Sequence, residues 1–129
     1  MLQLWIKCDI FLVMEEQSYY EISKSKFYGY KYGINSATEV KTILDNLKLE
    51  HKKARHFCYA YIVDDNGAKE KASDDGEPKG TAGMPILNVL KHKKIRNVLL
   101  VVVRYFGGIK LGAGGLVRAY TKTASLLFK

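Results

Sequence analysis

Cysteine is scarce in this sequence, which contains two cysteines among 129 residues. Cys8 and Cys58 cannot build a disulfide framework, and Cys58 lies in an apolar run that is typical of a strand. This usage favours a reducing, cytoplasmic environment. Spacings typical of zinc ligands, of a catalytic triad or of paired catalytic carboxylates are also missing, so we expect no metal or other cofactor, and binding rather than catalysis.

A long uninterrupted hydrophobic run is missing as well. Residues 1–14 are largely apolar, but Lys7 and Asp9 interrupt them. No basic segment precedes this stretch, and no small-residue cleavage site follows it, so it fits neither a membrane helix nor an export signal. We expect a strand there and no membrane partner.

Acidic residues are in the minority, with 13 Asp and Glu against 21 Lys and Arg, and the formal net charge is +8. This excess favours polyanionic partners, although a basic surface that only keeps the protein soluble explains it equally well. A length of 129 residues suits one domain with one hydrophobic core. We found no repeat, linker or low-complexity segment, so residues 1–129 are expected to form a single domain.

Three segments have the apolar spacing of amphipathic helices. The first, residues 36–53, opens on a serine with Glu39 three residues later, which is typical of a capping box. The second, residues 81–92, has Thr81 as its expected cap and ends in a lysine-rich turn. The third, residues 116–127, separates apolar side chains on one face from cations on the other.

Aromatic and β-branched residues mark the strands. Residues 19–34 and 57–63 predict strands, and the DDNG sequence that follows predicts a hairpin turn with a return strand over residues 68–72. The apolar run from Ile95 predicts an interior strand over residues 98–103 that is buried on both faces. Together with the three helices, these strands indicate an α+β fold.

Two polar, turn-rich motifs bracket the expected second helix and interior strand: KASDDGEPKGTAGMP over residues 71–85 and VVVRYFGGIKLGAGGLVRAY over residues 101–120. Because each lies where buried elements end, we expect their loops to meet and to form one site. The carboxylates of Asp74, Asp75 and Glu77 suit Mg²⁺, turn hydrogen bonds with ion pairs, or a groove partner. The neighbouring lysines favour turn hydrogen bonds and ion pairs.

The second motif supplies glycines between a buried strand and a helix start: Gly107, Gly108, Gly112, Gly114 and Gly115. Backbone N–H groups and a helix dipole in this arrangement can hold a phosphate group. The nucleotide-binding patterns are not present, because Lys110 is followed by Leu111 and because Val117 occupies the position of a third glycine. We expect phosphate or nucleic-acid backbone contact, with tight turns and close helix-to-sheet packing as the alternative.

Cations and rings accompany these glycines. The side chains that we expect to contact phosphate are Arg104, Arg118, Lys79 and Lys110, with Arg55 and His56 as candidates for the same surface. Tyr105 can either stack on a base or pack in the core, whereas Phe106 is expected to fill the core. His56 has no activated nucleophile near it in the sequence, so no catalytic residue is assigned.

Four groups of residues make up a longer pattern: Lys24-Ser25-Lys26-Phe27; Ala54-Arg55-His56 with Cys58; Ser73-Asp74-Asp75-Gly76-Glu77-Pro78 with Gly80-Thr81-Ala82-Gly83 and Pro85; and Val103-Arg104-Tyr105-Phe106-Gly107-Gly108 with Leu111-Gly112, Gly114-Gly115-Leu116 and Arg118-Ala119-Tyr120. This pattern covers residues 20–128. It resembles the IMPACT family, in particular its bacterial YigZ-like members.

The resemblance implies the βαβ-type fold that is shared by the second domain of a small-subunit ribosomal protein and by ribonuclease PH. We therefore expect a mixed sheet with helices packed on one face. The resemblance also implies a non-catalytic role in translation or its regulation, with RNA, the ribosome or a translation-regulatory protein as partner. Eukaryotic members regulate a stress-activated kinase that phosphorylates an initiation factor, but they carry an extra amino-terminal domain.

Kinship with ribonuclease PH supports one alternative function by analogy, a metal-assisted hydrolase or phosphoryl-transfer enzyme that uses Asp74, Asp75 and Glu77. Two expectations concern the ends of the chain. Bacterial relatives continue into a second, ferredoxin-like domain, so we expect a fragment or a reduced member. Relatives usually begin shortly before Lys24, so residues 1–13 are expected to be an extension from a start codon upstream of Met14.

Overall fold

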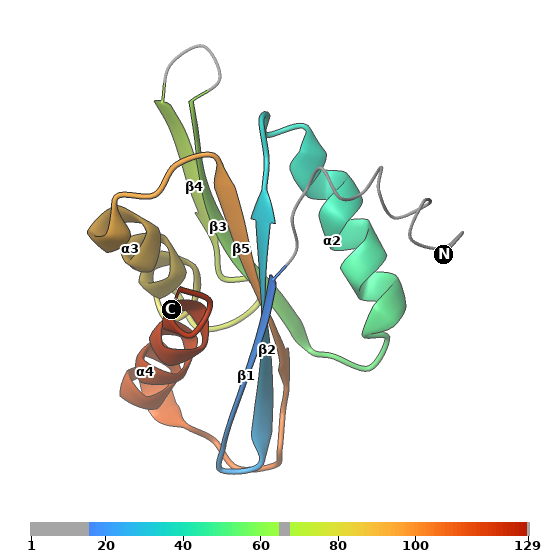
Figure 1. Cartoon of the computed structure of the whole chain (residues 1–129). Coiled ribbons are helices and arrows are strands. Elements are labelled where there is room, and N and C mark those ends of the chain that lie inside the picture. Colours follow the sequence, from blue (N-terminus) through green and yellow to red (C-terminus); the bar gives the residue numbers. More distant parts are fainter. Residues whose placement is uncertain (1–15, 65–67, 129) are drawn as a thin grey trace.

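The computed structural model describes residues 16–64 and 68–128. Over these residues the chain forms five strands and three helices (Figure 1). In chain order they are β1 (Glu16–Ile22), β2 (Ser25–Gly33), α2 (Glu39–Glu50), β3 (His56–Asp64), β4 (Ala68–Ser73), α3 (Gly83–Lys93), β5 (Val98–Tyr105) and α4 (Gly112–Ser125). The strand expected near the amino terminus, Cys8, and most of the expected DDNG turn lie outside the described residues.

The strands form one five-stranded sheet in the order β1-β2-β5-β3-β4. The central position of β5 confirms the interior strand that its apolar run predicts. All four pairings are antiparallel, so the expected mixed sheet is wrong. The reason lies in the connection through α3: β4 and β5 run in the same direction, but β3 lies between them and separates them.

Helices cover both faces of the sheet, which corrects the expectation that they pack on one face. α3 and α4 lie together on one side and α2 lies on the other (Figure 1). The side chains of β5 explain this arrangement, because Leu100 and Val102 belong to the core under α3 and α4, whereas Leu99 and Val101 belong to the core under α2. A strand that is apolar on both faces needs a cover on each.

The helices begin at other residues than expected. α2 begins at Glu39, whose carboxylate accepts the N–H groups of Asn35 and Ser36 at 2.7 and 3.0 Å. This contact is half of the predicted capping box, because the Ser36 hydroxyl bonds the N–H of Thr38 at 3.2 Å instead of completing it. Val40 is buried on the predicted apolar face.

α4 begins at Gly112, four residues before the expected start at Leu116. Glycine is a poor helix former, which is why the sequence predicts a loop there. Burial of the apolar face, which includes Leu116, Ala119 and Tyr120, offsets that preference. The second half of the glycine-rich motif is therefore the first turn of a helix. None of the described helices is both long and apolar enough to span a bilayer.

Candidate functional site

A buried ion pair joins the two polar motifs. Nη1 of Arg104, near the end of β5, lies 3.0 Å from Oε1 and 2.8 Å from Oε2 of Glu77, in the turn after β4. Arg104 is 5% exposed and Glu77 is 8% exposed. The two loops therefore meet in space, as the sequence predicts.

Two hydroxyl groups complete the surroundings of this pair. Tyr120 on α4 donates a hydrogen bond to Oε2 of Glu77, and Nη2 of Arg104 lies 3.4 Å from the hydroxyl oxygen of Ser25. Burial raises the pKa of the Tyr120 hydroxyl, which keeps it protonated as a donor. Four elements of the chain thus converge on one buried cluster.

Cys58 lies beside this cluster and is not activated as a nucleophile. Its thiol donates to the carbonyl oxygen of Asp74 at 3.1 Å and lies 3.4 Å from the Tyr120 hydroxyl. Burial raises the pKa of the Cys58 thiol, so the thiolate is strongly disfavoured. The thiol acts as a packed hydrogen-bond donor.

Asp74 provides the cap for α3. Its carboxylate accepts the N–H groups of Gly80 at 2.8 Å, Ala82 at 3.1 Å and Gly83 at 2.8 Å. Burial by itself would raise the pKa of Asp74, but these three bonds lower it below the usual 3.8. Thr81, the expected cap, instead donates to the carbonyl oxygen of Pro78 at 2.6 Å.

Asp75 and His56 tie the same turn to β3. The Asp75 carboxylate accepts the N–H of Phe57 at 2.7 Å, and Nδ1 of His56 lies 2.8 Å from the Asp75 carbonyl oxygen. Nδ1 is therefore the donor, and Nε2 lies 3.7 Å from Oε1 of Glu77. All three carboxylates serve turn hydrogen bonds or an ion pair, which confirms the favoured prediction for this cluster. Among residues 16–64 and 68–128, no group of three or more His, Cys, Asp or Glu side chains is arranged to hold a metal ion.

A cavity of about 420 Å³ opens beside the ion pair. Its charged and polar wall comes from Arg55, His56, Glu77, Arg104 and Lys110, and its apolar wall comes from Pro78, Phe106, Leu111, Ala113 and Leu116, with Gly112 between them. Five residues predicted to contact a ligand are thus brought together: Arg55, His56, Arg104, Lys110 and Gly112.

The first turn of α4 opens into this cavity. Among residues 16–64 and 68–128 no side chain caps the helix, and its first turn contains no acidic residue. The first N–H groups of a helix have no partner within it, and they carry partial positive charge. At α3 the Asp74 carboxylate meets this need. At α4 the exposed charges in the cavity wall are the cations Arg55 and Lys110, and the buried Glu77 carboxylate in the same wall is paired with Arg104.

Phe106 and Arg104 lie close together in the cavity wall. Phe106 is 39% exposed, so the expectation that it fills the core is wrong. Its ring lies 5.6 Å from the Arg104 guanidinium and 5.7 Å from that of Arg55. Nη1 and Nη2 of Arg104 are engaged, but Nε is buried and has no hydrogen-bond partner among the described residues.

Other predicted residues lie away from the cavity. Tyr105 is on the α2 face, where its hydroxyl bonds Nδ1 of His51 and its ring packs on Tyr28. Lys79 and Arg118 are exposed and are not part of the cavity wall.

The other four glycines of the motif have separate environments. A Cβ on Gly107 would lie 2.1 Å from the Lys24 backbone, so Gly107 allows the close approach that the structural alternative predicts. Gly108, with φ of +92°, lies in a bend of the loop between β5 and α4. Gly114 and Gly115 lie within α4, outside the cavity wall, and Arg118 reaches back toward Gly114.

Sequence reasoning did not assign Tyr120 and Ser25 to the site. Tyr120 occupies an apolar helix position, and only its hydroxyl distinguishes it from a core residue. Ser25 is fully buried at the start of β2, where it contacts Arg104 and also accepts the N–H of Gly107 at 3.2 Å. A small polar residue beside a turn gave no signal of such a role.

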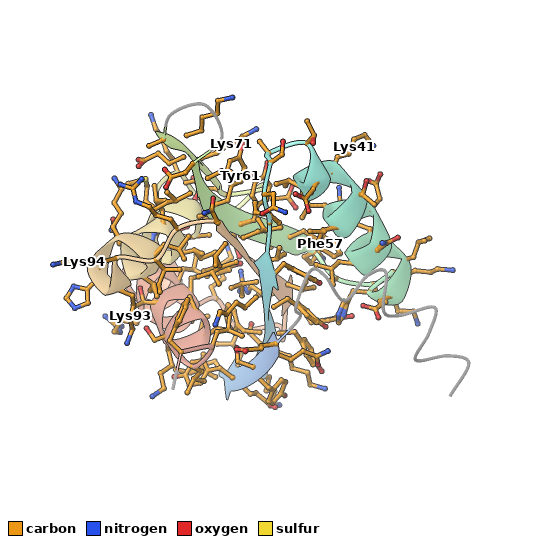
Figure 2. The ribbon with its side chains drawn as sticks, turned by 45° about the horizontal axis from the view of Figure 1, so that its top comes forward. Lys41, Phe57, Tyr61, Lys71, Lys93 and Lys94 are labelled. Carbon is orange, nitrogen blue, oxygen red and sulfur yellow. The ribbon has the colours of Figure 1, made fainter. Side chains whose placement is uncertain are left out.

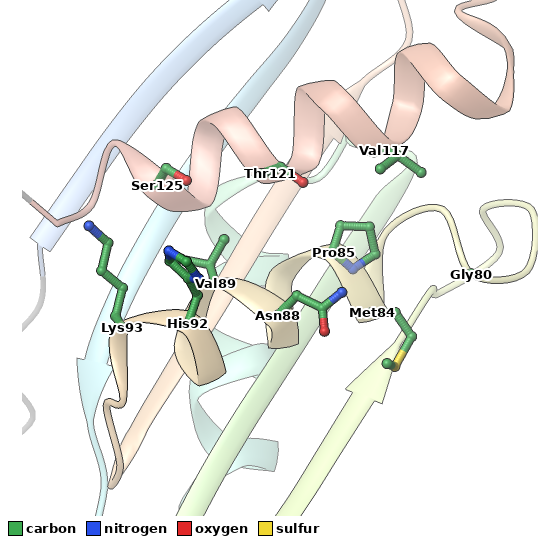
Figure 3. A pocket seen from close by; sticks show the side chains of 10 residues that line it. All are labelled: Gly80, Met84, Pro85, Asn88, Val89, His92, Lys93, Val117, Thr121 and Ser125. Carbon is green, nitrogen blue, oxygen red and sulfur yellow. The ribbon is translucent and has the colours of Figure 1, made fainter.

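A second cavity of about 420 Å³ lies between α3 and α4. Figure 3 shows Met84, Asn88 and His92 along α3, with Val117 and Thr121 along α4. It contains none of the residues that the sequence assigns to a site. Its basic side chains, His92 and Lys93, are confined to the end near the carboxyl terminus of α3.

The distribution of positive charge alone does not show which of the two cavities binds an anionic ligand. Figure 2 shows lysines on separate parts of the molecule, among them Lys41 on α2, Lys71 on β4, and Lys93 and Lys94 at the end of α3. The cavity at α4 differs because cations, unpaired backbone donors and a buried guanidinium occur together there.

The sequence and structure of this chain are similar to those of one family of known proteins. The model of the Impact N-terminal domain matches residues 23–128. The IMPACT family member YvyE of Bacillus subtilis is 47% identical over 104 residues, which are 81% of this chain and 48% of that protein. YigZ of Escherichia coli is 42% identical over 102 residues, 78% of this chain and 50% of that protein. The chain therefore spans about half the length of these relatives.

A further relative and two solved structures are also similar to this chain. Protein IMPACT of Danio rerio is 36% identical over 95 residues, 69% of this chain and 29% of that protein. The crystal structure of a hypothetical protein superposes with a TM-score of 0.83 at 37% identity, covering 88% of this chain and 56% of that one. The two-domain translational regulator Yih1 superposes with a TM-score of 0.54 at 24% identity, covering 86% of this chain and 44% of that one. This likeness supports the fold alone.

Proposed function

The chain belongs to the IMPACT family through its Impact N-terminal domain, and from this premise we propose that it is a non-catalytic module that binds the phosphate backbone of single-stranded RNA in translation or its regulation. The contacts are made at the cavity beside α4. The family resemblance suggests the ribosome or a translation-regulatory protein as the setting of this binding.

One observation carries the proposal: an uncapped helix start opens into a cavity that also presents Arg55 and Lys110. Backbone N–H groups at a helix start bind phosphate oxygens directly, and the dipole favours their negative charge. Arg55 and Lys110 are both exposed, so they can reach a polyanion without unfolding. The net charge of +8 supplies long-range attraction to the same class of ligand.

The structure changes the role that we assign to Arg104. Its charge is compensated by Glu77, and it is fixed in the cavity wall by contacts on both Nη atoms. Arg104 therefore shapes the site, whereas Arg55 and Lys110 supply the charge that a phosphate meets. The predicted sequence preference is weak, because the cavity offers no element that reads base edges.

The metal-assisted enzyme has less support. Asp74 holds three backbone N–H groups, Asp75 holds the N–H of Phe57, and Glu77 is paired with Arg104. Each carboxylate would have to give up a structural contact to coordinate a metal. A role in binding leaves all of these contacts in place.

Binding of fluorescent single-stranded RNA at several salt concentrations tests the proposal. We expect log K against log salt to fall with a slope of about −2 to −3, as for three or four phosphates on a single strand. Lys110→Ala and Arg55→Ala should each flatten the slope by about 0.7. Lys93→Ala, which removes an equal charge outside the cavity, is the matched control and should leave the slope nearly unchanged.

Two results would contradict the proposal. One is an affinity weaker than about 100 µM at low salt, the weak end of ordinary non-specific binding. The other is an equal effect of Lys93→Ala and Lys110→Ala, which would show that the charge of the whole protein, rather than this cavity, attracts the RNA.

A further inference from the structure

We propose that the cavity at the start of α4 holds a terminal phosphate monoester of single-stranded RNA in preference to an internal phosphodiester. This inference rests on the proposed function and narrows it from backbone binding in general to recognition of a phosphorylated end. The ligand group is the same at a 5′ or a 3′ end, so the experiment below separates the two.

The number and kind of donors favour a monoester. The first turn of α4 provides the N–H groups of Gly112, Ala113 and Gly114, which no side chain in the described part of the chain caps. Arg55 and Lys110 add charged donors to the same cavity. An internal phosphodiester offers two non-bridging oxygens and one negative charge. A terminal monoester offers three such oxygens and a charge of about −1.5 to −2 at neutral pH, so it matches this set better.

Arg104 gives a second and independent indication of a ligand. Its side chain is 5% exposed and lies in the cavity wall, and its Nε is a buried donor without an acceptor among the described residues. Buried donors are nearly always satisfied in folded proteins, by protein, water or a ligand. An anion seated against this wall lies beside a guanidinium that Glu77 and Ser25 already hold in place.

The space around Gly112 allows the close approach that such a ligand needs. Gly112 has φ of +76°, and a Cβ built on it would meet no atom within 4 Å. Phosphate oxygens can therefore reach the backbone without a side chain in the way. Beyond this point the apolar wall of Phe106, Leu111 and Leu116 offers a surface for the terminal nucleoside.

Matched oligonucleotides test the inference directly. One single-stranded RNA of about 12 residues is prepared with a 5′-phosphate or a 5′-hydroxyl, and with a 3′-phosphate or a 3′-hydroxyl, the fluorophore being attached to the opposite end each time. A strand of this length is long enough for contacts with roughly three or four phosphates. We expect one phosphorylated end to bind the 129-residue chain about tenfold or more tightly than its hydroxyl counterpart, because hydrogen bonds to charged groups are the strong ones.

Ala113→Asp locates the site without damaging the fold. A carboxylate in the first turn stabilises a helix, so the melting temperature should stay the same or rise. The same carboxylate occupies the donors of α4 and repels phosphate, so the tenfold preference for a phosphorylated end should disappear. Asn88→Asp, an equal charge change at an exposed position on α3, is the control and should keep the preference.

The outcomes are distinguishable. Equal affinity for phosphorylated and hydroxyl ends, with Ala113→Asp weakening both, overturns the end preference and leaves the proposed function standing. If Ala113→Asp keeps the preference for a phosphorylated end, that end binds at another place on the protein, which overturns the inference. Failure of every oligonucleotide to bind removes the proposed function and the inference together.

Discussion

Arg104 and Glu77 form a buried ion pair across the two polar motifs, with Nη1 of Arg104 at 3.0 and 2.8 Å from the two carboxylate oxygens. The pair fixes the end of β5 against the turn that follows β4. It also forms one wall of the cavity at α4. The same contact therefore stabilises the fold and shapes the candidate site.

Removing either partner of this pair should destabilise the protein strongly. Glu77→Ala leaves a buried guanidinium uncompensated, and Arg104→Ala leaves a buried carboxylate, so we expect each to cost about 3–5 kcal/mol in the free energy of unfolding. Urea denaturation measures this cost. Lys91→Ala, which breaks an exposed pair with Glu70, is the control and should cost about 0–1 kcal/mol. Wild-type stability of Arg104→Ala would show that the pair is not structural.

The Tyr120 hydroxyl should contribute measurably to stability. Tyr120→Phe removes the donor to the buried Glu77 carboxylate but keeps the ring, which packs edge-on against Phe27. We expect a loss of about 1.5–3 kcal/mol in the free energy of unfolding, the range for hydrogen bonds to charged groups. Tyr59→Phe, at a partly exposed position on the opposite face, is a control for the chemical change. An equal loss of stability in the two variants would show that the hydrogen bond from Tyr120 to Glu77 adds no stability.

Asp74 should make stability depend on pH below about 4. Its native pKa is lowered by three N–H groups, so its contribution is fully present above the usual value of 3.8 and is lost as the pH falls through the native pKa. Asp74→Ala should cost about 1–2 kcal/mol at pH 7 as a lost helix cap. Urea denaturation between pH 7 and pH 2.5, on the order of one unit below the usual value, should then show a shallower acid decline for the variant than for the wild type. Parallel curves would contradict the cap.

Two glycines of the second motif should respond to alanine with opposite signs. Gly107→Ala places a Cβ 2.1 Å from the Lys24 backbone, so about 1–3 kcal/mol should be lost to overpacking. Gly114→Ala lies within α4 and meets only the end of the Arg118 side chain at 3.4 Å, so helix propensity should add about 0.5–1 kcal/mol. Thermal denaturation of both variants measures the signs. A destabilised Gly114→Ala would place that glycine in a loop.

Much of the fold could be predicted from local patterns. The apolar run through Val101 and Val102 correctly predicted the central strand, because β-branched residues without polar interruption need cover on both faces. The same fact implied helices on both faces, but the family resemblance led to a one-faced arrangement. Because Gly114 and Gly115 are poor helix formers, the sequence predicts a later start for α4 than the structure has. Burial of Leu116 and Tyr120 in the core stabilises the additional first turn.

The site was predicted in part. The sequence correctly predicted that the loops of the two motifs meet, because each motif lies where buried elements end. It also correctly predicted that Asp74 and Asp75 accept structural hydrogen bonds. The pairing of Arg104 with Glu77 depends on a contact between residues 27 apart, which no local spacing encodes. Strand alternation could have placed Tyr105 on the face opposite Arg104, because neighbouring residues of a strand point to opposite sides.

The most direct test of the account is an amide NMR titration of the ¹⁵N-labelled chain with 5′-phosphorylated single-stranded RNA, read at the start of α4. We predict that the N–H resonances of Gly112, Ala113 and Gly114 shift most, together with Arg55 and Lys110, because these groups lie at the phosphate. Shifts concentrated instead on Asn88 and Thr121, in the groove between α3 and α4, or no shift at the start of α4 under saturating RNA, would contradict the central claim.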